Sequence, residues 1–267
     1  MAERSEKTQK GNPHGLTVRQ HVFPRASILR FDAGDGVEIL DMKREVRRRS
    51  NADDPLFCAD RAWGHDPEAG WMKDKEDAFQ SLATAVLLAP PEAFDDTESE
   101  VIGEFYALWQ ARAERRHLPT QRIGPKEDFV RMRRDYSPDE LEQLEKAGIT
   151  PFRGDGSLAM SHIMGPVIRL AMDRIRQGME GRRWRVVTAA DGEFCVPDVP
   201  AHGIIPLSPS VALHSTRGGA VSKSDVAKIN AAMAEHSREY LLASSLANCP
   251  GLEKLISTVA DSAGAAT

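Results

Sequence analysis

The pattern of apolar and polar positions near the amino terminus predicts two strands. Residues 17–23 are rich in β-type side chains and end at Pro24, and residues 37–41 follow a turn that contains two glycines. Between these strands, residues 26–31 predict a short helix or a tight segment. We therefore expect the amino-terminal part to contribute strands to a sheet.

Residues 72–88 predict the first long helix, because their apolar side chains recur at spacings of three and four. Pro90 ends this pattern. At about 100° per residue, Glu76 falls inside the apolar stripe and not on the solvated face. A carboxylate at such a position needs a partner, since an unpaired buried charge is very costly.

Two capping boxes mark the starts of further helices. Thr97 with Glu100 predicts a helix that runs to about residue 116, and Ser137 with Glu140 predicts a short helix that ends at Gly148. One or two helical turns are also expected within residues 126–134.

The second half of the chain contains two more helical patterns. Residues 157–181 predict a helix that Gly165-Pro166 kinks or divides. The last long helix is expected to start after Ser222 or Ser224 and to end near residue 246, with Asn230 on its apolar stripe and Arg238 at the margin. A terminal helix at residues 251–259 follows.

Residues 184–215 combine strand signals with turn chemistry. The β-rich residues 184–188 and 193–196 flank Asp191-Gly192, a pair that favours positive φ, so a hairpin is expected. The prolines that follow cannot donate ladder hydrogen bonds, which confines residues 198–202 to a loop or a strand edge. Residues 211–213 predict a short closing strand.

Together these elements predict an α+β fold. A small antiparallel sheet, made of the amino-terminal strands and the 184–215 meander, is expected to pack against five or six helices. Strands and helices do not alternate regularly, which disfavours a doubly wound parallel sheet. Uniform composition predicts one domain over residues 16–260, between disordered tails at 1–15 and 261–267.

The composition of the 267 residues is that of a soluble globular protein, with 41% apolar and 28% charged residues. A net charge of −5 argues against general binding to nucleic acid or anionic membranes, but it leaves a local basic groove open. The start of the chain lacks an apolar leader, and no run approaches the roughly 20 apolar residues of a membrane span. Three widely separated cysteines suit reduced thiols, so a cytoplasmic location is expected.

Several parts of the sequence resemble a widespread bacterial family of unknown function. The family's opening His-x-Val-Pro…Leu-Arg-x-Phe segment is similar to residues 20–31, although Phe23 here separates Val22 from Pro24. Its glutamate-bearing helix, its Trp-x-Val/Ile strand and its Phe-x-x-x-Asp-x-Pro…Pro-Leu-Ser-Pro segment correspond to Glu76, residues 184–187 and residues 194–209. The resemblance extends over about residues 17–245 and implies a fold and a site location, not a reaction.

Four polar residues stand at strand ends, in the proline-rich loop or on apolar helical stripes, and we interpret them as candidate catalytic groups. A histidine, two carboxylates and an amide can bind a divalent metal ion or supply a general base with an orienting acid. The four are His21, Glu76, Asp198 and Asn230, with Arg25, His202 and Arg238 as candidate substrate-binding residues.

Each catalytic candidate also has a structural interpretation. His21 would satisfy a backbone carbonyl, and Glu76 would pair with Arg25 or Arg30. Asp198 would act as a turn or cap residue, and Asn230 would bond a neighbouring loop. If the four share one pocket, the sequence favours a hydrolase, in its most specific form a nuclease-like phosphodiesterase that acts on nucleic acid or another phosphodiester.

Uneven charge supports an alternative function without catalysis. Residues 53–105 hold 14 acidic and 3 basic residues, whereas residues 43–49 hold five basic residues and one acidic one. Such runs usually lie on a solvated surface, but either can also bind a protein partner. The sequence therefore leaves open a hydrolase and a protein-interaction or regulatory module.

Overall fold

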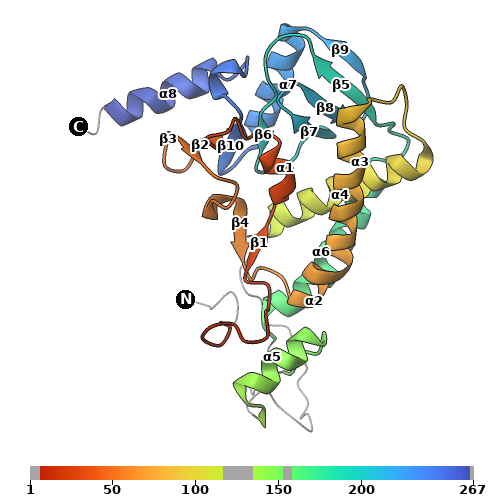
Figure 1. Cartoon of the computed structure of the whole chain (residues 1–267), viewed down its shortest axis with the longest axis vertical. Helices are drawn as coiled ribbons and strands as arrows, with labels where there is room; N and C mark the ends of the chain where they lie inside the picture. Colours follow the sequence, from red (N-terminus) through yellow and green to blue (C-terminus); the bar gives the residue numbers. More distant parts are fainter. Residues whose placement is uncertain (1–6, 117–134, 153–157, 265–267) are drawn as a thin grey trace.

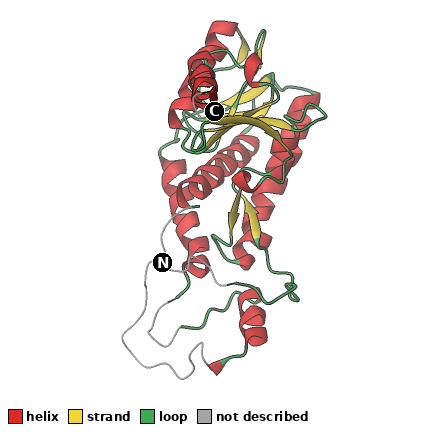
Figure 2. Cartoon of the chain, turned by 90° about the vertical axis from the view of Figure 1, so that its left-hand side faces the viewer, coloured by secondary structure: helices red, strands yellow, loops and turns green. Residues whose placement is uncertain are grey.

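The computed structural model describes residues 7–116, 135–152 and 158–264, and side chains as far as residue 259. It confirms the α+β class (Figure 1). Two four-stranded sheets lie at one end of the elongated molecule, and α5 (Pro138–Lys146) lies at the other (Figure 2). None of the helices within the described ranges is long and apolar enough to span a bilayer.

The amino-terminal strands belong to two different sheets. β1 (Arg19–His21) pairs antiparallel with β4 (Cys58–Asp60), and α1 (Arg25–Leu29) follows β1 directly. β2 (Val37–Asp41) forms a hairpin with β3 (Val46–Ser50). The basic run that we assigned to the surface thus forms a strand at the edge of its sheet.

The two four-stranded sheets are assembled from distant segments. One has the order β3-β2-β10-β6, with β6 at Val196–Pro197 and β10 at Tyr240–Ala243. The other has the order β7-β8-β5-β9, in which β5 and β9 run parallel and the other pairs antiparallel. Its strands are β5 (Arg185–Ala189), β7 (Ile204–Ser208), β8 (Val211–His214) and β9 (Gly219–Val221).

The predicted hairpin over residues 184–196 is wrong. Gly192 adopts positive φ (85°) as expected, but β5 and β6 enter different sheets. After the turn, the amide of Glu193 donates to the carbonyl of Asn248, and the amide of Phe194 donates to that of Pro209. Because those backbone groups are bound elsewhere, β5 pairs with β8, and the observed hairpin of this region is β7 with β8.

The long helices match the predictions in place, but several ends differ. α4 starts two residues earlier than expected, because Asp95 and Glu98 form its capping box. α6 continues through Pro166 without division. The predicted turns at residues 126–134 lie outside the described residues. The helices are α2 (His65–Pro67), α3 (Lys73–Leu88), α4 (Asp96–Arg115), α6 (Met160–Gln177), α7 (Lys223–His236) and α8 (Glu253–Gly264), with short segments η1 (Pro55–Phe57), η2 (Glu68–Met72) and η4 (Leu246–Asn248).

The prediction that the last long helix reaches residue 246 is also wrong. α7 begins at the predicted Ser222 cap but ends at His236, where Ser237 takes an extended ψ of 140°. The next segment becomes β10, which pairs with β2 on one side and β6 on the other. A run of four apolar residues has no period that separates a strand from a helix, so partners far along the chain decide its structure.

Alternate side chains of β10 enter two hydrophobic cores. Tyr240 and Leu242 belong to the larger core, and Leu241 and Ala243 belong to the smaller one. The larger core contains the buried faces of α3, α4 and α6, and the smaller one contains that of α7. β10 therefore lies between the two cores and contributes side chains to both.

Candidate anion-binding site

The carboxyl end of α4 carries two buried arginines, Arg112 and Arg116, one helical turn apart. Arg112 Nη1 donates to the carbonyl of His21 at 3.3 Å, and Arg116 Nη2 donates to that of Cys58 at 2.8 Å. His21 and Cys58 face each other in the β1/β4 ladder. The two arginines thus fix the end of α4 to one position of this ladder, where cations also interact favourably with the helix dipole.

Arg112 lies in a compact ionic cluster. Its guanidinium donates to Glu68 at 2.7 Å and also pairs with Glu76, while the indole of Trp63 donates to Glu68 and lies 5.1 Å below the guanidinium carbon. Burial raises the pKa of Glu76, Arg112 opposes this, and the nearby Glu68 adds to it. Burial favours a lower pKa for Arg112, but the two carboxylates raise it overall. The charges of Arg112, Glu68 and Glu76 are thus paired with one another.

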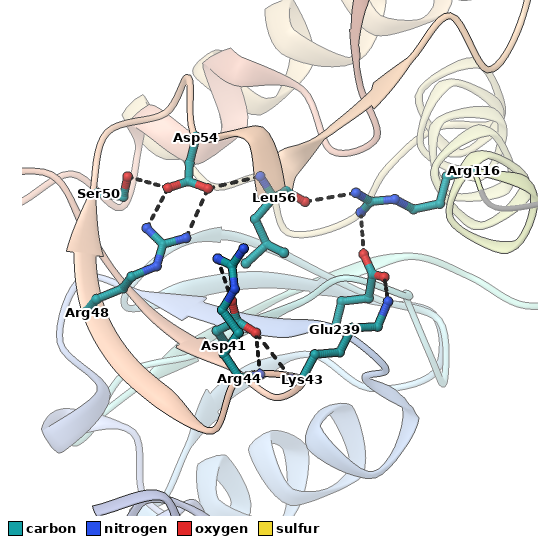
Figure 3. Close-up of polar contacts among 9 residues, drawn as sticks. All are labelled: Asp41, Lys43, Arg44, Arg48, Ser50, Asp54, Leu56, Arg116 and Glu239. Atoms are coloured by element: carbon teal, nitrogen blue, oxygen red, sulfur yellow. Dashed lines mark hydrogen bonds and ion pairs between the residues drawn. The ribbon is translucent and has the colours of Figure 1, made fainter. Parts of the chain in front are cut away.

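Arg116, in contrast, borders a hollow of about 520 Å³ (Figure 3). The hollow lies where the β2/β3 hairpin, the loop before η1, the end of α4 and the segment before β10 meet. Almost all of its lining is charged. The charged residues are Asp41, Lys43, Arg44, Arg48, Asp54, Arg116 and Glu239.

Two carboxylates of this hollow have structural roles. Asp54 accepts two hydrogen bonds from Arg48, at 2.5 and 3.0 Å, and further bonds from the hydroxyl of Ser50 and the amide of Leu56. These bonds outweigh the effect of burial and lower the pKa of Asp54 to about 2. Asp41 accepts from the amides of Lys43 and Arg44 and so fixes the β2/β3 turn. The hydrogen bonds within the chain thus occupy both carboxylates.

The remaining cations of the hollow differ in how they are held. The side chains of Lys43 and Arg44 are 63% and 74% exposed, and they pair with Glu239 and Asp41 respectively, the latter at 3.5 Å. Arg116 Nη1 lies 3.3 Å from Glu239, an ion-pair distance without the geometry of a hydrogen bond. Among the described residues, Nε and Nη1 of Arg116 have no hydrogen-bond acceptor, although the side chain is only 5% exposed.

The structure brings two of the predicted catalytic residues to Arg112. His21 contributes its backbone carbonyl, while its ring bonds the carbonyl of Ala52 at 3.0 Å, as in its structural interpretation. Glu76 forms an ion pair as its structural interpretation required, but with Arg112 and not with Arg25 or Arg30. The imidazole and the carboxylate therefore have different partners.

Asp198 and Arg238 both adjoin Glu239, which lines the Arg116 hollow. The carboxylate of Asp198 accepts from the amide of Arg238 at 2.8 Å, and the amide of Asp198 donates to the carbonyl of Tyr240 at 3.2 Å. Burial raises the pKa of Asp198, and its bonds from the amides of Arg238 and Glu239 act against this. Asp198 therefore positions the segment that carries Glu239.

The other predicted residues have separate environments. Asn230 is fully buried, accepts from the amide of Cys195 and donates to the carbonyls of Glu193 and Pro250, so it joins three segments of the smaller core. Arg25 forms a two-bond pair with Asp53. His202 adopts positive φ (57°) and packs edge-on against His236 at 4.6 Å.

The described residues contain no arrangement of side chains typical of a metal site. Across residues 7–116, 135–152 and 158–264, no group of three or more histidine, cysteine or acidic side chains is arranged to hold a metal ion. Buried Cys58, Cys195 and Cys249 are free thiols.

The predicted basic cluster is largely paired within the chain. Arg47 bonds Glu38 at 2.7 Å, and Arg49 bonds Asp35 at 2.6 Å. In the acidic stretch, Glu104 pairs with Lys75 and Arg176. Many charges of the basic and acidic runs are thus balanced by opposite charges from other parts of the folded chain.

Sequence reasoning missed the arginines and the carboxylate that define the hollow. Arg112 and Arg116 continue the apolar stripe of Phe105, Leu108 and Trp109 at helical spacing, so their position predicts burial. Glu239 gave no comparable signal, because the segment around it was assigned to a helix. Comparison of the chain with family models, curated proteins and solved structures finds no match.

Proposed function

We propose that this protein binds a small phosphorylated ligand, by its phosphate group, in the hollow beside Arg116. One observation carries the proposal: the guanidinium of Arg116 is buried and held by two backbone carbonyls, yet two of its nitrogens have no hydrogen-bond acceptor among the described residues. A buried donor without an acceptor is costly, so such groups call for an explanation. An anion in the hollow would supply the acceptor.

The charges of the hollow favour a phosphate group. Arg116 presents a planar set of donors at a fixed place, and Lys43 and Arg44 extend from the rim with enough freedom to turn toward an anion. Guanidinium groups suit the tetrahedral oxygens of phosphate, while lysine acts as a mobile point charge. The lining holds four basic and three acidic side chains, a net charge of +1.

Glu239 acts as an internal competitor in this proposal. It pairs with both Lys43 and Arg116, which are the groups that a phosphate would contact. Binding therefore requires the ligand to replace the carboxylate on at least one of them. This exchange favours ligands with more negative charge than a single carboxylate, as a phosphate monoester has at neutral pH.

Isothermal titration calorimetry with phenyl phosphate and inorganic phosphate tests the proposal. We expect Lys43→Gln with Arg44→Gln to weaken binding at least tenfold, since two of the three contacting cations are lost. The control is Arg47→Gln with Arg49→Gln, which removes the same charge from β3 residues that do not line the hollow. Glu239→Gln is expected to strengthen binding because the competitor loses its charge.

Equal loss of affinity in the two double variants would show a general charge effect and reject the pocket. Thermal unfolding of each variant establishes that the proteins compared are folded. Hydrolysis is not part of this proposal. Release of inorganic phosphate from the probe, measured in parallel, tests the separate prediction of a hydrolase.

A further inference from the structure

A second hollow, of about 370 Å³, is lined by residues of α2, α5 and α6. In Figure 1, α2 and α5 lie away from the two four-stranded sheets. The walls of the hollow include Trp71, Pro67 and Pro166. A Cβ added at Gly165 would come within 2.8 Å of Pro67 Cγ, so α6 and the end of α2 are in close contact there. This contact fixes one wall of the hollow. Pockets for small organic molecules commonly have this size and this apolar surface, with a few polar groups placed among it.

His65 contributes a hydrogen-bond donor to the second hollow. The backbone amide of Thr17 donates to Nδ1 of His65 at 3.1 Å, and an amide N–H can only donate. Nδ1 must therefore carry a lone pair, which places the ring hydrogen of the neutral imidazole on Nε2. Nε2 is on the side of the ring away from Thr17 and has no hydrogen-bond partner among the described residues.

Arg169 contributes a positive charge. Its guanidinium carbon lies 5.4 Å from the ring centre of Trp71, a cation–π contact that leaves its N–H groups available at the ring edge. Within the described ranges, Arg169 has no ion pair and no side-chain hydrogen bond. The cation and the aromatic wall thus form one surface.

The acidic residues of the second hollow limit the charge of a ligand. Glu145 is buried in a two-bond pair with Arg61, at 2.8 and 2.6 Å, so its charge is balanced. Asp66 is exposed and lies near Gly148 at the rim, where solvent screens it. One screened negative charge opposes a dianion more than a monoanion.

We infer that this second hollow binds a small organic carboxylate. The carboxylate accepts hydrogen bonds from His65 Nε2 and the guanidinium of Arg169, and the apolar body of the ligand packs against Trp71 and the two prolines. This site is separate from the proposed phosphate site in residues, in place and in ligand class.

Benzoate is a suitable probe, with neutral benzamide as its isostere. We expect benzoate to bind and to quench tryptophan fluorescence, and benzamide to bind at least tenfold more weakly. Arg169→Gln and His65→Gln should each weaken benzoate binding about tenfold, and Asp66→Asn should strengthen it. Trp71→Phe should remove the quench while calorimetry still detects binding, because Trp63, Trp109 and Trp184 are buried and do not line this hollow.

Arg185→Gln is the matched control, since Arg185 is another exposed arginine without a partner among the described residues, and it does not line this hollow. Equal affinities of Arg169→Gln and Arg185→Gln for benzoate would overturn the inference, and so would equal binding of benzoate and benzamide. Loss of benzoate binding in Lys43→Gln with Arg44→Gln would also contradict it, because that variant changes only the phosphate site.

Discussion

At the scale of single residues, the structure is organised by charged side chains in buried positions. Arg112 is almost completely buried, and its value to the fold lies in the two carboxylates that it neutralises. Removing one member of such a cluster is far more costly than exchanging the whole cluster for apolar groups, since it leaves charge without a partner.

The Arg112 cluster gives a first prediction. Arg112→Met should lower the free energy of unfolding by about 3–5 kcal/mol, because Glu68 and Glu76 lose their counter-ion. Urea denaturation measures this change. Adding Glu76→Gln to Arg112→Met should recover part of the loss, and strictly additive effects of the two substitutions would show that they do not interact.

His214 gives a prediction about pH. Burial, followed by the charges of Arg217, Arg182 and His202, lowers the pKa of His214 to about 4, and its Nδ1 accepts from the amide of Thr216 at 3.1 Å. Between pH 6.5 and pH 4 the unfolded chain therefore binds more protons, so stability falls as the pH falls through this window.

We expect the contribution of His214 to be about 1 kcal/mol between pH 7 and pH 5, after allowance for solvent screening. His214→Gln should flatten this part of the curve, as measured by urea midpoints at the two pH values. An unchanged slope in the variant would mean that other groups cause the pH dependence.

At the scale of elements, sequence patterns located most helices but not all of their ends. Periodic apolar stripes predicted α3, α4, α6 and α7, because a helix satisfies its own backbone and needs only one buried face. Strand pairing was harder to predict. The turn at Gly192 was correct, but the partners of β5 and β6 come from residues far away in the sequence.

In the candidate site, too, local features were predictable and long-range contacts were not. Burial of Asp198 and Asn230, and half-burial of Glu76, were predictable from their positions on apolar stripes or between prolines, and the structure places each against a specific partner. The hollow beside Arg116 was not predictable, because it depends on β10 following α7. Local propensity carries no information about such a long-range arrangement.

Two capping boxes at the start of α4 are compatible with the sequence, Asp95 with Glu98 and Thr97 with Glu100, and the structure contains the first. Asp95→Ala should lower the free energy of unfolding by about 1 kcal/mol, because the side chain of Asp95 accepts from the amide of Glu98 at 2.7 Å. Thr97→Ala, in the box predicted from the sequence, should change it by less than about 0.5 kcal/mol. Thermal or urea denaturation compares the two, and a larger effect of Thr97→Ala would place the cap at the sequence-predicted position.

At the scale of the whole molecule, the two cores raise the question of whether they unfold together. Trp63, Trp109 and Trp184 belong to the larger core and Trp71 packs against it, so tryptophan fluorescence reports on that core alone. β10 is shared by both cores, and we expect a single cooperative transition.

Leu241 and Leu242 test this cooperativity. Both are fully buried, but Leu241 faces the smaller core and Leu242 the larger one. Each substitution to alanine should cost about 2–5 kcal/mol, and Leu241→Ala should lower the fluorescence midpoint although no tryptophan lies in its core. A fluorescence midpoint that moves only with Leu242→Ala would show two independently unfolding units.

The shared strand also constrains how this chain can evolve. Because side chains of β10 alternate between the cores, one inserted or deleted residue after Ser237 would exchange the two faces and change the direction of Glu239. Descendants of this sequence can replace apolar residues here with others of similar volume. A change of one residue in the segment between α7 and the end of β10 is therefore expected to be far more damaging than such replacements.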